Sequence, residues 1–164
     1  MLGSVEKNKL CLRQGAKVGD IIMVTGDFGG SIKGKHLKFT PRLKESRFLA
    51  DNFKINAMID VSDGLAADLW QLSRASGVRL RVEALRIPLA PAAGSVNSAL
   101  MDGEDFELLF AVSRRDAARM PRRVGSCPVT RIGQVVGRGQ GVELIDRRGR
   151  ITVLRHTGFT HFDE

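Results

Sequence analysis

Short hydrophobic runs, bounded by glycine and polar residues, recur along the chain and predict β-strands. Residues 21–25 are rich in β-branched side chains, and residues 106–112 alternate with the period of a strand. The run at 57–59 is continuously apolar and ends at Asp60, which is typical of a central strand covered on both faces. Further strands are predicted at 78–82, 129–136, 142–145 and 151–154, the last two joined by an Arg-Arg-Gly turn.

Hydrophobic positions at helical spacing predict two helices in the first half of the chain. The first follows Pro41 and covers 42–53, and the second presents Leu65, Leu69 and Leu72 on one face, with Ser62 or Asp63 as its N-cap and Gly77 at its end. Residues 88–97, rich in Pro, Ala and Ser, predict a loop. Helices followed by hairpin-like strands predict an α/β layered domain with a mixed sheet.

Composition places the chain among ordinary globular proteins. Its 164 residues suit one domain, and its 43% hydrophobic and 27% charged residues exclude a disordered chain. The sequence contains neither an apolar run of membrane-spanning length nor a recognisable signal peptide, so we expect no membrane association. The two cysteines, Cys11 and Cys127, form no Cys-x-x-Cys pair, which favours free thiols in a reducing, cytoplasmic setting.

The charge distribution points to an anionic partner and a metal. Lys and Arg number 26 against 18 acids, for a net charge of +8, yet aromatic residues make up only 5% of the chain and Tyr is absent. Scarce aromatic side chains argue against a nucleic-acid platform. The acids concentrate in two segments, which invites a metal-site hypothesis: Asp60, Asp63 and Asp68 in the first, and Asp102, Glu104, Asp105 and Glu107 in the second.

The first acidic segment places a buried strand directly before a helix N-terminus. Helix N-termini favour phosphate, but the carboxylates of Asp60 and Asp63 would repel it unless a divalent cation lay between them. As hard oxygen ligands they suit Mg²⁺ bridged to a polyphosphate, with Ser62 hydrogen-bonding an anion. The alternative remains open that Ser62 and Asp63 only cap the helix while Asp60 ends a strand.

Two further segments allow a chemical and a structural interpretation. Residues 102–110 place four acids before an apolar strand, where they would face cations, or form an Asp-Gly turn with a polar outer face. Residues 25–35 are rich in glycine and could expose N–H groups to phosphate, with Lys33 or Lys35 adding charge. They match neither the Walker A nor the G-x-G-x-x-G pattern, so a structural turn is the alternative.

The order of these motifs resembles one enzyme family over about residues 5–162. The C-terminal half of the thiamine-monophosphate kinases, within the wider aminoimidazole-ribonucleotide-synthase-like superfamily, is similar to this chain in six segments. They are Arg13-Gln14-Gly15-Ala16-Lys17-Val18-Gly19-Asp20, Val24-Thr25-Gly26, Ile59-Asp60-Val61-Ser62-Asp63-Gly64-Leu65, Gly103-Glu104-Asp105-Phe106-Glu107-Leu108-Leu109-Phe110, Thr130-Arg131-Ile132-Gly133 and Gly158-Phe159-Thr160-His161-Phe162.

The resemblance implies a three-layer α/β/α domain and Mg²⁺-dependent transfer of the ATP γ-phosphate to thiamine monophosphate, giving thiamine diphosphate. Such a transfer depends on metal and cationic clamps more than on a nucleophilic side chain, and no catalytic side chain is assigned. By motif, the implied roles are Mg²⁺ ligands for Asp60 and Asp63, nucleotide contacts for Arg13 and Ser62, and substrate contacts for Glu104 and Phe159.

The resemblance also implies that residues 1–164 form a single C-terminal domain. The family's N-terminal ATP-binding domain is then absent, the fragment is inactive alone, and the full-length protein is a homodimer that binds neither nucleic acid nor membrane. Asp102, where the family has glycine, and the divergent stretch 27–42 leave the phosphate acceptor open. The alternatives are another ATP-dependent superfamily member with a different acceptor, a basic module that binds anions or nucleic acid, and an interaction domain without catalysis.

Overall fold

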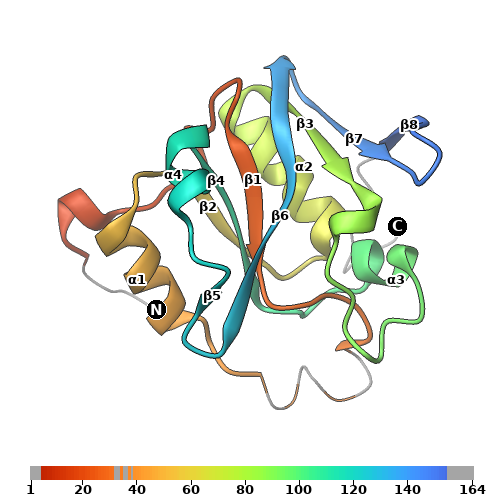
Figure 1. The fold of residues 1–164 in the computed structure, drawn as a ribbon, viewed down its shortest axis with the longest axis horizontal. Helices are drawn as coiled ribbons and strands as arrows, with labels where there is room; N and C mark the ends of the chain where they lie inside the picture. Colours follow the sequence, from red (N-terminus) through yellow and green to blue (C-terminus); the bar gives the residue numbers. More distant parts are fainter. Residues whose placement is uncertain (1–4, 32–33, 35–36, 38, 155–164) are drawn as a thin grey trace, which may run out of the picture.

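The computed structural model describes residues 5–31, 34, 37 and 39–154, which contain one mixed sheet of eight strands (Figure 1). Its order is β2-β4-β1-β6-β3-β7-β8, with the short β5 paired to β6. The β3–β7 pair is parallel and the other pairs are antiparallel. The strands are β1 Ile21–Thr25, β2 Ile55–Val61, β3 Val78–Glu83, β4 Glu107–Val112, β5 Arg123–Val124, β6 Cys127–Arg138, β7 Gly141–Ile145 and β8 Ile151–Leu154.

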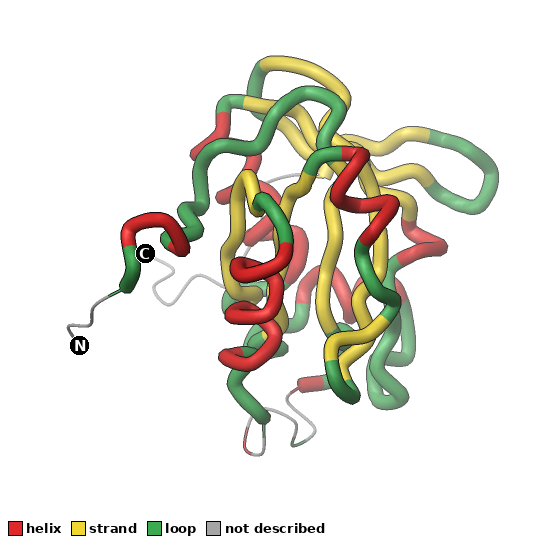
Figure 2. Tube along the Cα trace, turned by 60° about the vertical axis from the view of Figure 1, so that its left-hand side comes forward, coloured by secondary structure: helices red, strands yellow, loops and turns green. Residues whose placement is uncertain are grey.

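Helices cover both faces of this sheet, which confirms the predicted α/β/α layering. The α-helices are α1 Leu43–Asn52, α2 Leu65–Ser76, α3 Val96–Met101 and α4 Arg114–Arg119, with 3₁₀ turns η1 Lys7–Lys9 and η4 Ala84–Arg86. One hydrophobic cluster joins the sheet to α2, and a second joins the opposite face to α1 and α4. In Figure 1 α2 lies behind the strands. In Figure 2, where the left-hand side of Figure 1 comes forward, α1 lies in front of the sheet.

Strand β1 shows how the sequence produces these layers. All five of its residues are buried, and successive side chains point to opposite faces of a strand. Ile22 and Val24 pack in the cluster under α2, whereas Ile21 and Met23 pack in the cluster under α1. A strand covered on both faces therefore reads as one continuous hydrophobic run.

The prediction that 57–59 belongs to a central strand is wrong about its position. Strand β2 lies at one end of the sheet order, although Ala57 faces the α2 cluster and Met58 the α1 cluster. Burial on both faces accounts for the apolar run, and the run carries no information on strand order. The outer edge is closed where the Met58 N–H donates to the carbonyl of Leu12 at 2.8 Å.

Two short helices were absent from the sequence prediction. The predicted loop 88–97 ends earlier, because α3 begins at Val96 after Ser95, whose hydroxyl accepts from the N–H of Ser98 at 3.1 Å. Ser113 caps α4 in the same way. Six residues are too few to show a helical period. None of the helices among the described residues is long and apolar enough to cross a membrane.

Antiparallel pairing brings three of the segments with candidate chemistry to one end of the sheet. Strands β1 and β2 both pair with β4, so the C-terminal ends of β1 and β2 lie beside the N-terminal end of β4. Val61 is opposite Glu107, and Val24 is opposite Leu109. The glycine-rich loop (residues 26–31), the loop 62–64 and the acidic loop (residues 102–106) therefore meet at this end, near the lower ends of β1 and β2 in Figure 1.

Candidate functional site

The end of β2 and the loop after it carry three of the predicted site residues, with Asp60 as the last residue but one of β2 and Ser62 and Asp63 in the loop. Asp60 and Asp63 are exposed and Ser62 is half-buried, so both carboxylates are open to solvent. The Ser62 hydroxyl donates to the carboxylate of Asp60. The two acids therefore lie just before the N-terminus of α2 (Leu65–Ser76), where a cation could bridge them to an anionic ligand.

Neither Ser62 nor Asp63 caps helix α2, which corrects the sequence interpretation. The N-cap is Gly64 at φ 105°, and no side chain at that position accepts a hydrogen bond. Asp68 in the first turn instead points back and accepts from the N–H groups of Ser62 at 3.0 Å and Asp63 at 3.1 Å. The side chains of Ser62 and Asp63 therefore do not serve as the cap of α2.

Burial raises the pKa of Asp68 to about 6, although the N–H groups of Asp63 and Ser62 act in the opposite direction. The folded chain then keeps this proton up to about pH 6, whereas the unfolded chain loses it near pH 4. The carboxyl therefore contributes stability that is fully present below pH 4 and lost as the pH rises through 6.

Replacing Asp68 with Asn should remove this pH dependence, because the amide oxygen can still accept from both N–H groups. We expect Asp68→Asn to be more stable than the wild type above pH 7 by on the order of 1–3 kcal/mol, because one pKa unit corresponds to about 1.4 kcal/mol. The advantage should vanish near pH 4. Urea unfolding at pH 4 and 7.5, followed by the fluorescence of Trp70, measures it; a constant difference between the two chains would contradict the assignment.

The acidic loop is bonded directly to the loop after β2. The N–H of Glu104 donates to the carbonyl of Ser62 at 2.8 Å, and the N–H of Phe106 donates to the carbonyl of Val61 at 2.9 Å. A Cβ on Gly103 would lie 2.8 Å from the Ser62 carbonyl oxygen, so the close approach requires glycine. The structure thus places the backbone of Glu104 next to the predicted metal and nucleotide residues.

Glu104 and Phe106 adopt a conformation that side chains disfavour. Their φ angles are 62° and 53°, in the left-handed region where a Cβ costs on the order of 1–2 kcal/mol. Such residues persist where the surrounding structure holds them, and they cluster at functional sites. Strand β4 accordingly begins at Glu107, one residue later than the predicted strand.

Two carboxylates of the acidic segment bind the glycine-rich loop. Asp105, which is buried, accepts from the N–H of Gly29 at 3.1 and 3.2 Å. Asp102 accepts from the N–H of Gly30 at 2.7 Å and from the hydroxyl of Ser98. These glycine N–H groups hold protein carboxylates, which supports the structural interpretation of the loop over a phosphate cradle.

Glu107 was predicted only as one acid of the second segment, facing a cation or solvent, whereas the structure buries it as the partner of Arg42. Its side chain is 1% exposed and accepts from Arg42 at 2.6 and 2.7 Å and from the Thr25 hydroxyl at 2.8 Å. The hydrogen bonds that Arg42 donates to Glu107 raise the pKa of Arg42, so the guanidinium stays charged. The sequence signal that could have predicted this role is an acid within a strand, flanked by the apolar residues Phe106 and Leu108.

Arg13 and Phe159 are not brought to this cluster by the described contacts. Arg13 is exposed and lies beside the middle of β2, because Leu12 accepts from Met58 and a Cβ on Gly15 would touch the Asn56 carbonyl. Phe159 lies outside the described residues. Their predicted contacts with nucleotide and substrate stay predictions.

Asp60 and Asp63, the predicted Mg²⁺ ligands, do not by themselves provide a complete set of metal ligands. Within residues 5–31, 34, 37 and 39–154, no group of three or more His, Cys, Asp and Glu side chains is arranged to hold a metal ion. Mg²⁺, however, is commonly held by one or two carboxylates together with waters and substrate phosphates. Asp60 near the end of β2 and Asp63 in the loop after it are both exposed, and they fit that kind of site.

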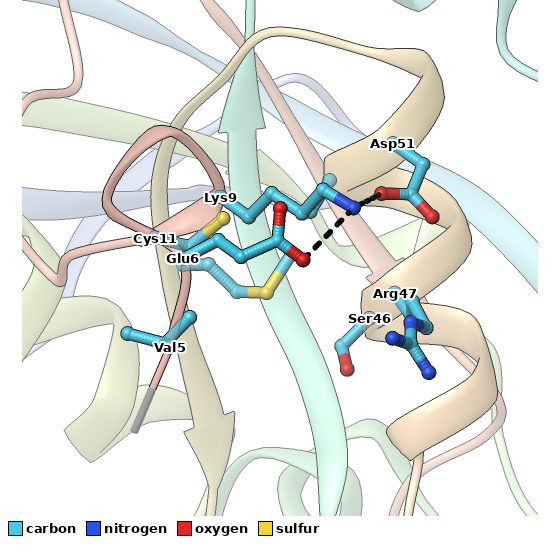
Figure 3. Close-up of a pocket in the computed structure, with 9 residues that line it drawn as sticks. Val5, Glu6, Lys9, Cys11, Ser46, Arg47 and Asp51 are labelled. Carbon is cyan, nitrogen blue, oxygen red and sulfur yellow. Dashed lines mark ion pairs between the residues drawn. The ribbon is translucent and has the colours of Figure 1, made fainter.

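Two hollows of the described surface lie elsewhere. One, of about 680 Å³, lies between the N-terminal segment and α1, and Figure 3 shows Lys9 there, 3.0 Å from Asp51 and 3.5 Å from Glu6. The other, of about 630 Å³, is lined by Arg86, Arg122 and Arg131 beside apolar residues. Neither hollow is lined by Asp60, Asp63 or Glu104.

Comparison with known families identifies this combination of fold and motifs. Residues 21–146 match the family described as "AIR synthase related protein, C-terminal domain". The chain belongs to this family. The match runs from the start of β1 past the end of β7, so it includes the loop after β2, the acidic loop and Glu107.

Relatives within the AIR-synthase-related family are thiamine-monophosphate kinases. The enzyme from Rhodopirellula baltica is 40% identical to the chain, over 77% of the chain and 43% of the relative. A crystal structure of the enzyme from Stenotrophomonas maltophilia K279a is 29% identical, with a TM-score of 0.73, over 85% of the chain and 54% of that structure. A structure described as "AaThiL complexed with AMPPCP and TMP" is 26% identical, with a TM-score of 0.74, over 93% and 54%.

These matches cover only part of each relative. The chain spans about half the length of the curated relatives that it matches, from 43% to 59% of theirs. What the AIR-synthase-related domain does within a whole protein is therefore a matter of proposal.

Proposed function

We propose that this chain is the C-terminal domain of an ATP- and Mg²⁺-dependent kinase that converts thiamine monophosphate to thiamine diphosphate. The thiamine-monophosphate kinases among its relatives support the reaction, and one similar structure is described as a complex with AMPPCP and TMP. The family's N-terminal domain would supply the remaining ligands, and we expect the whole enzyme to be a cytoplasmic homodimer without nucleic-acid partners.

One observation carries the proposal. The hydrogen bond from the N–H of Glu104 to the carbonyl of Ser62 joins two acidic motifs that are about 40 residues apart in the sequence. Phosphoryl transfer requires the metal, the donor phosphate and the acceptor to be held together, because positioning and charge neutralisation supply most of the catalysis. If these motifs only formed turns, joining them would not require a backbone conformation that costs free energy. Such conformations cluster at functional sites.

Each residue at this end of the sheet has a chemical role in the proposal. Asp60 and Asp63 would hold Mg²⁺, which neutralises phosphate charge when bound. The Ser62 hydroxyl would donate a hydrogen bond to an ATP phosphate oxygen. The exposed Glu104 carboxylate would accept a hydrogen bond from thiamine monophosphate. Arg13 and Phe159 are proposed to contact the nucleotide phosphates and the thiamine moiety, as the family resemblance implies.

The direct test joins this chain to its N-terminal domain and measures ATP-dependent formation of thiamine diphosphate. We expect turnover that requires Mg²⁺ and stops when the metal is chelated, and no turnover from the 164-residue chain alone. A folded full-length protein that binds ATP and leaves thiamine monophosphate unchanged would refute this acceptor. It would favour another superfamily reaction, for which Asp102 and the stretch 27–42 are the first sequence differences to examine.

A further inference from the structure

We propose that Arg42 is a positioning residue for Glu104. Through Glu107 it holds the acidic loop in the conformation that presents Glu104 beside Ser62. The role of Glu104 as a substrate contact rests on the proposed function, whereas the conformational part of the inference rests on the contacts of this chain alone.

Donors from two other elements fix the Glu107 carboxylate. Arg42, immediately before α1, donates from Nε to Oε2 at 2.7 Å and from a terminal nitrogen to Oε1 at 2.6 Å. Thr25, at the end of β1, donates its hydroxyl to Oε2 at 2.8 Å and accepts from the N–H of Leu108 at 2.8 Å. A two-pronged Arg–carboxylate pair fixes orientation as well as distance, which a single ammonium contact does not.

This carboxylate lies directly beside the strained loop. Glu107 begins β4, and the preceding Phe106 and Glu104 have φ angles of 53° and 62°. In this conformation the N–H of Phe106 donates to the carbonyl of Val61 and the N–H of Glu104 donates to the carbonyl of Ser62. If the Arg42 contacts were lost, the buried Glu107 carboxylate would lose its two hydrogen bonds from the guanidinium and its charge partner, which should destabilise the start of β4.

A second contact ties the same segment to the acidic loop. The ring of Phe39, three residues before Arg42, lies 4.2 Å from the ring of Phe106 between centroids. Residues 39–42 thus hold the loop at two points, one apolar and one charged. A segment that served only to start α1 would need neither contact.

The experiment compares Arg42→Lys with Arg47→Lys, the same substitution at an exposed position of α1. Amide hydrogen exchange is measured by NMR in the 164-residue chain. We expect Arg42→Lys to speed exchange at Glu104 and Phe106 at least tenfold more than at Ala111 in the middle of β4, and Arg47→Lys to leave this ratio unchanged. If Arg42→Lys does not fold, Thr25→Val removes one donor to Glu107 together with the acceptor of the Leu108 N–H, and should shift the ratio in the same direction.

In the full-length enzyme, Arg42→Lys should raise the KM for thiamine monophosphate about tenfold and the KM for ATP less than twofold, a split that general loss of folded enzyme would not produce. An unchanged exchange ratio in Arg42→Lys, or in Thr25→Val where Arg42→Lys does not fold, would overturn the inference. Should the wild-type enzyme not use thiamine monophosphate, a changed ratio would still support positioning, and only the proposed acceptor would fall.

Discussion

Gly26→Ala should destabilise the chain by about 3–5 kcal/mol, the range expected when a buried ion pair loses a partner. Gly26 follows Thr25 with φ +59°, and a Cβ there would lie 2.1 Å from the Glu107 carboxyl carbon. Both the backbone strain and the displacement of Glu107 from Arg42 oppose the substitution. The single methyl group would act on a carboxylate that is only 1% exposed.

The loss is measured as the free energy of unfolding in urea, followed by Trp70 fluorescence. Gly137→Ala is the matched control, because a Cβ at Gly137 in β6 meets nothing within 4 Å. We expect that control to change stability by less than about 0.5 kcal/mol. Equal stabilities of the two variants would show that Glu107 can move away at little cost, and would weaken the role given to its contacts.

Most strands could be predicted from the sequence because of where they lie in the layers. Strand β1 was predicted over 21–25 and β8 over 151–154, as the structure has them. Two-sided burial makes β1 a continuous apolar run, so its ends are marked where polar and glycine residues begin. Strand order is a long-range property, and the same apolar run at 57–59 suited the edge position of β2 as well as a central one.

The candidate site was predictable only in part, for a similar reason. Asp60, Ser62, Asp63 and Glu104 stand in local motifs whose chemistry can be read from neighbouring residues. The pair of Arg42 and Glu107 joins residues 65 apart in the sequence. In an alternating pattern Glu107 reads as an outward polar position, whereas β4 is buried along all six residues. Only the fold shows that this acid faces inward and needs a cation.

At the N-terminus of α2 a local sequence rule, the preference for Ser and Asp at the N-cap, predicted the wrong residue. Ser62 and Asp63 are common N-cap types, and either would satisfy the sequence pattern. Gly64 takes the cap position instead, and Asp68 supplies the acceptor from inside the helix. A side chain that caps a helix is held by the backbone, whereas a side chain that binds metal must be free to turn toward the ligand.

Asp60→Asn should lower kcat/KM of the proposed full-length kinase about 100-fold or more, corresponding to about 3 kcal/mol of transition-state stabilisation. The amide is a weaker Mg²⁺ ligand than the carboxylate and carries no charge to oppose that of the cation. Since Asp60 is exposed and an amide oxygen can still accept from Ser62, we expect the fold and its stability to be retained.

Asp51→Asn is the control, because Asp51 is an exposed acid on α1 whose partner is Lys9. Rates are measured over a range of Mg²⁺ concentrations, and Asp60→Asn should need more metal for half-maximal activity whereas Asp51→Asn should behave as the wild type. A rate that falls without any change in metal requirement would assign Asp60 to another step. A wild-type rate would show that the cation is held elsewhere, because a carboxylate that binds Mg²⁺ in the transition state cannot lose its charge without effect on the reaction.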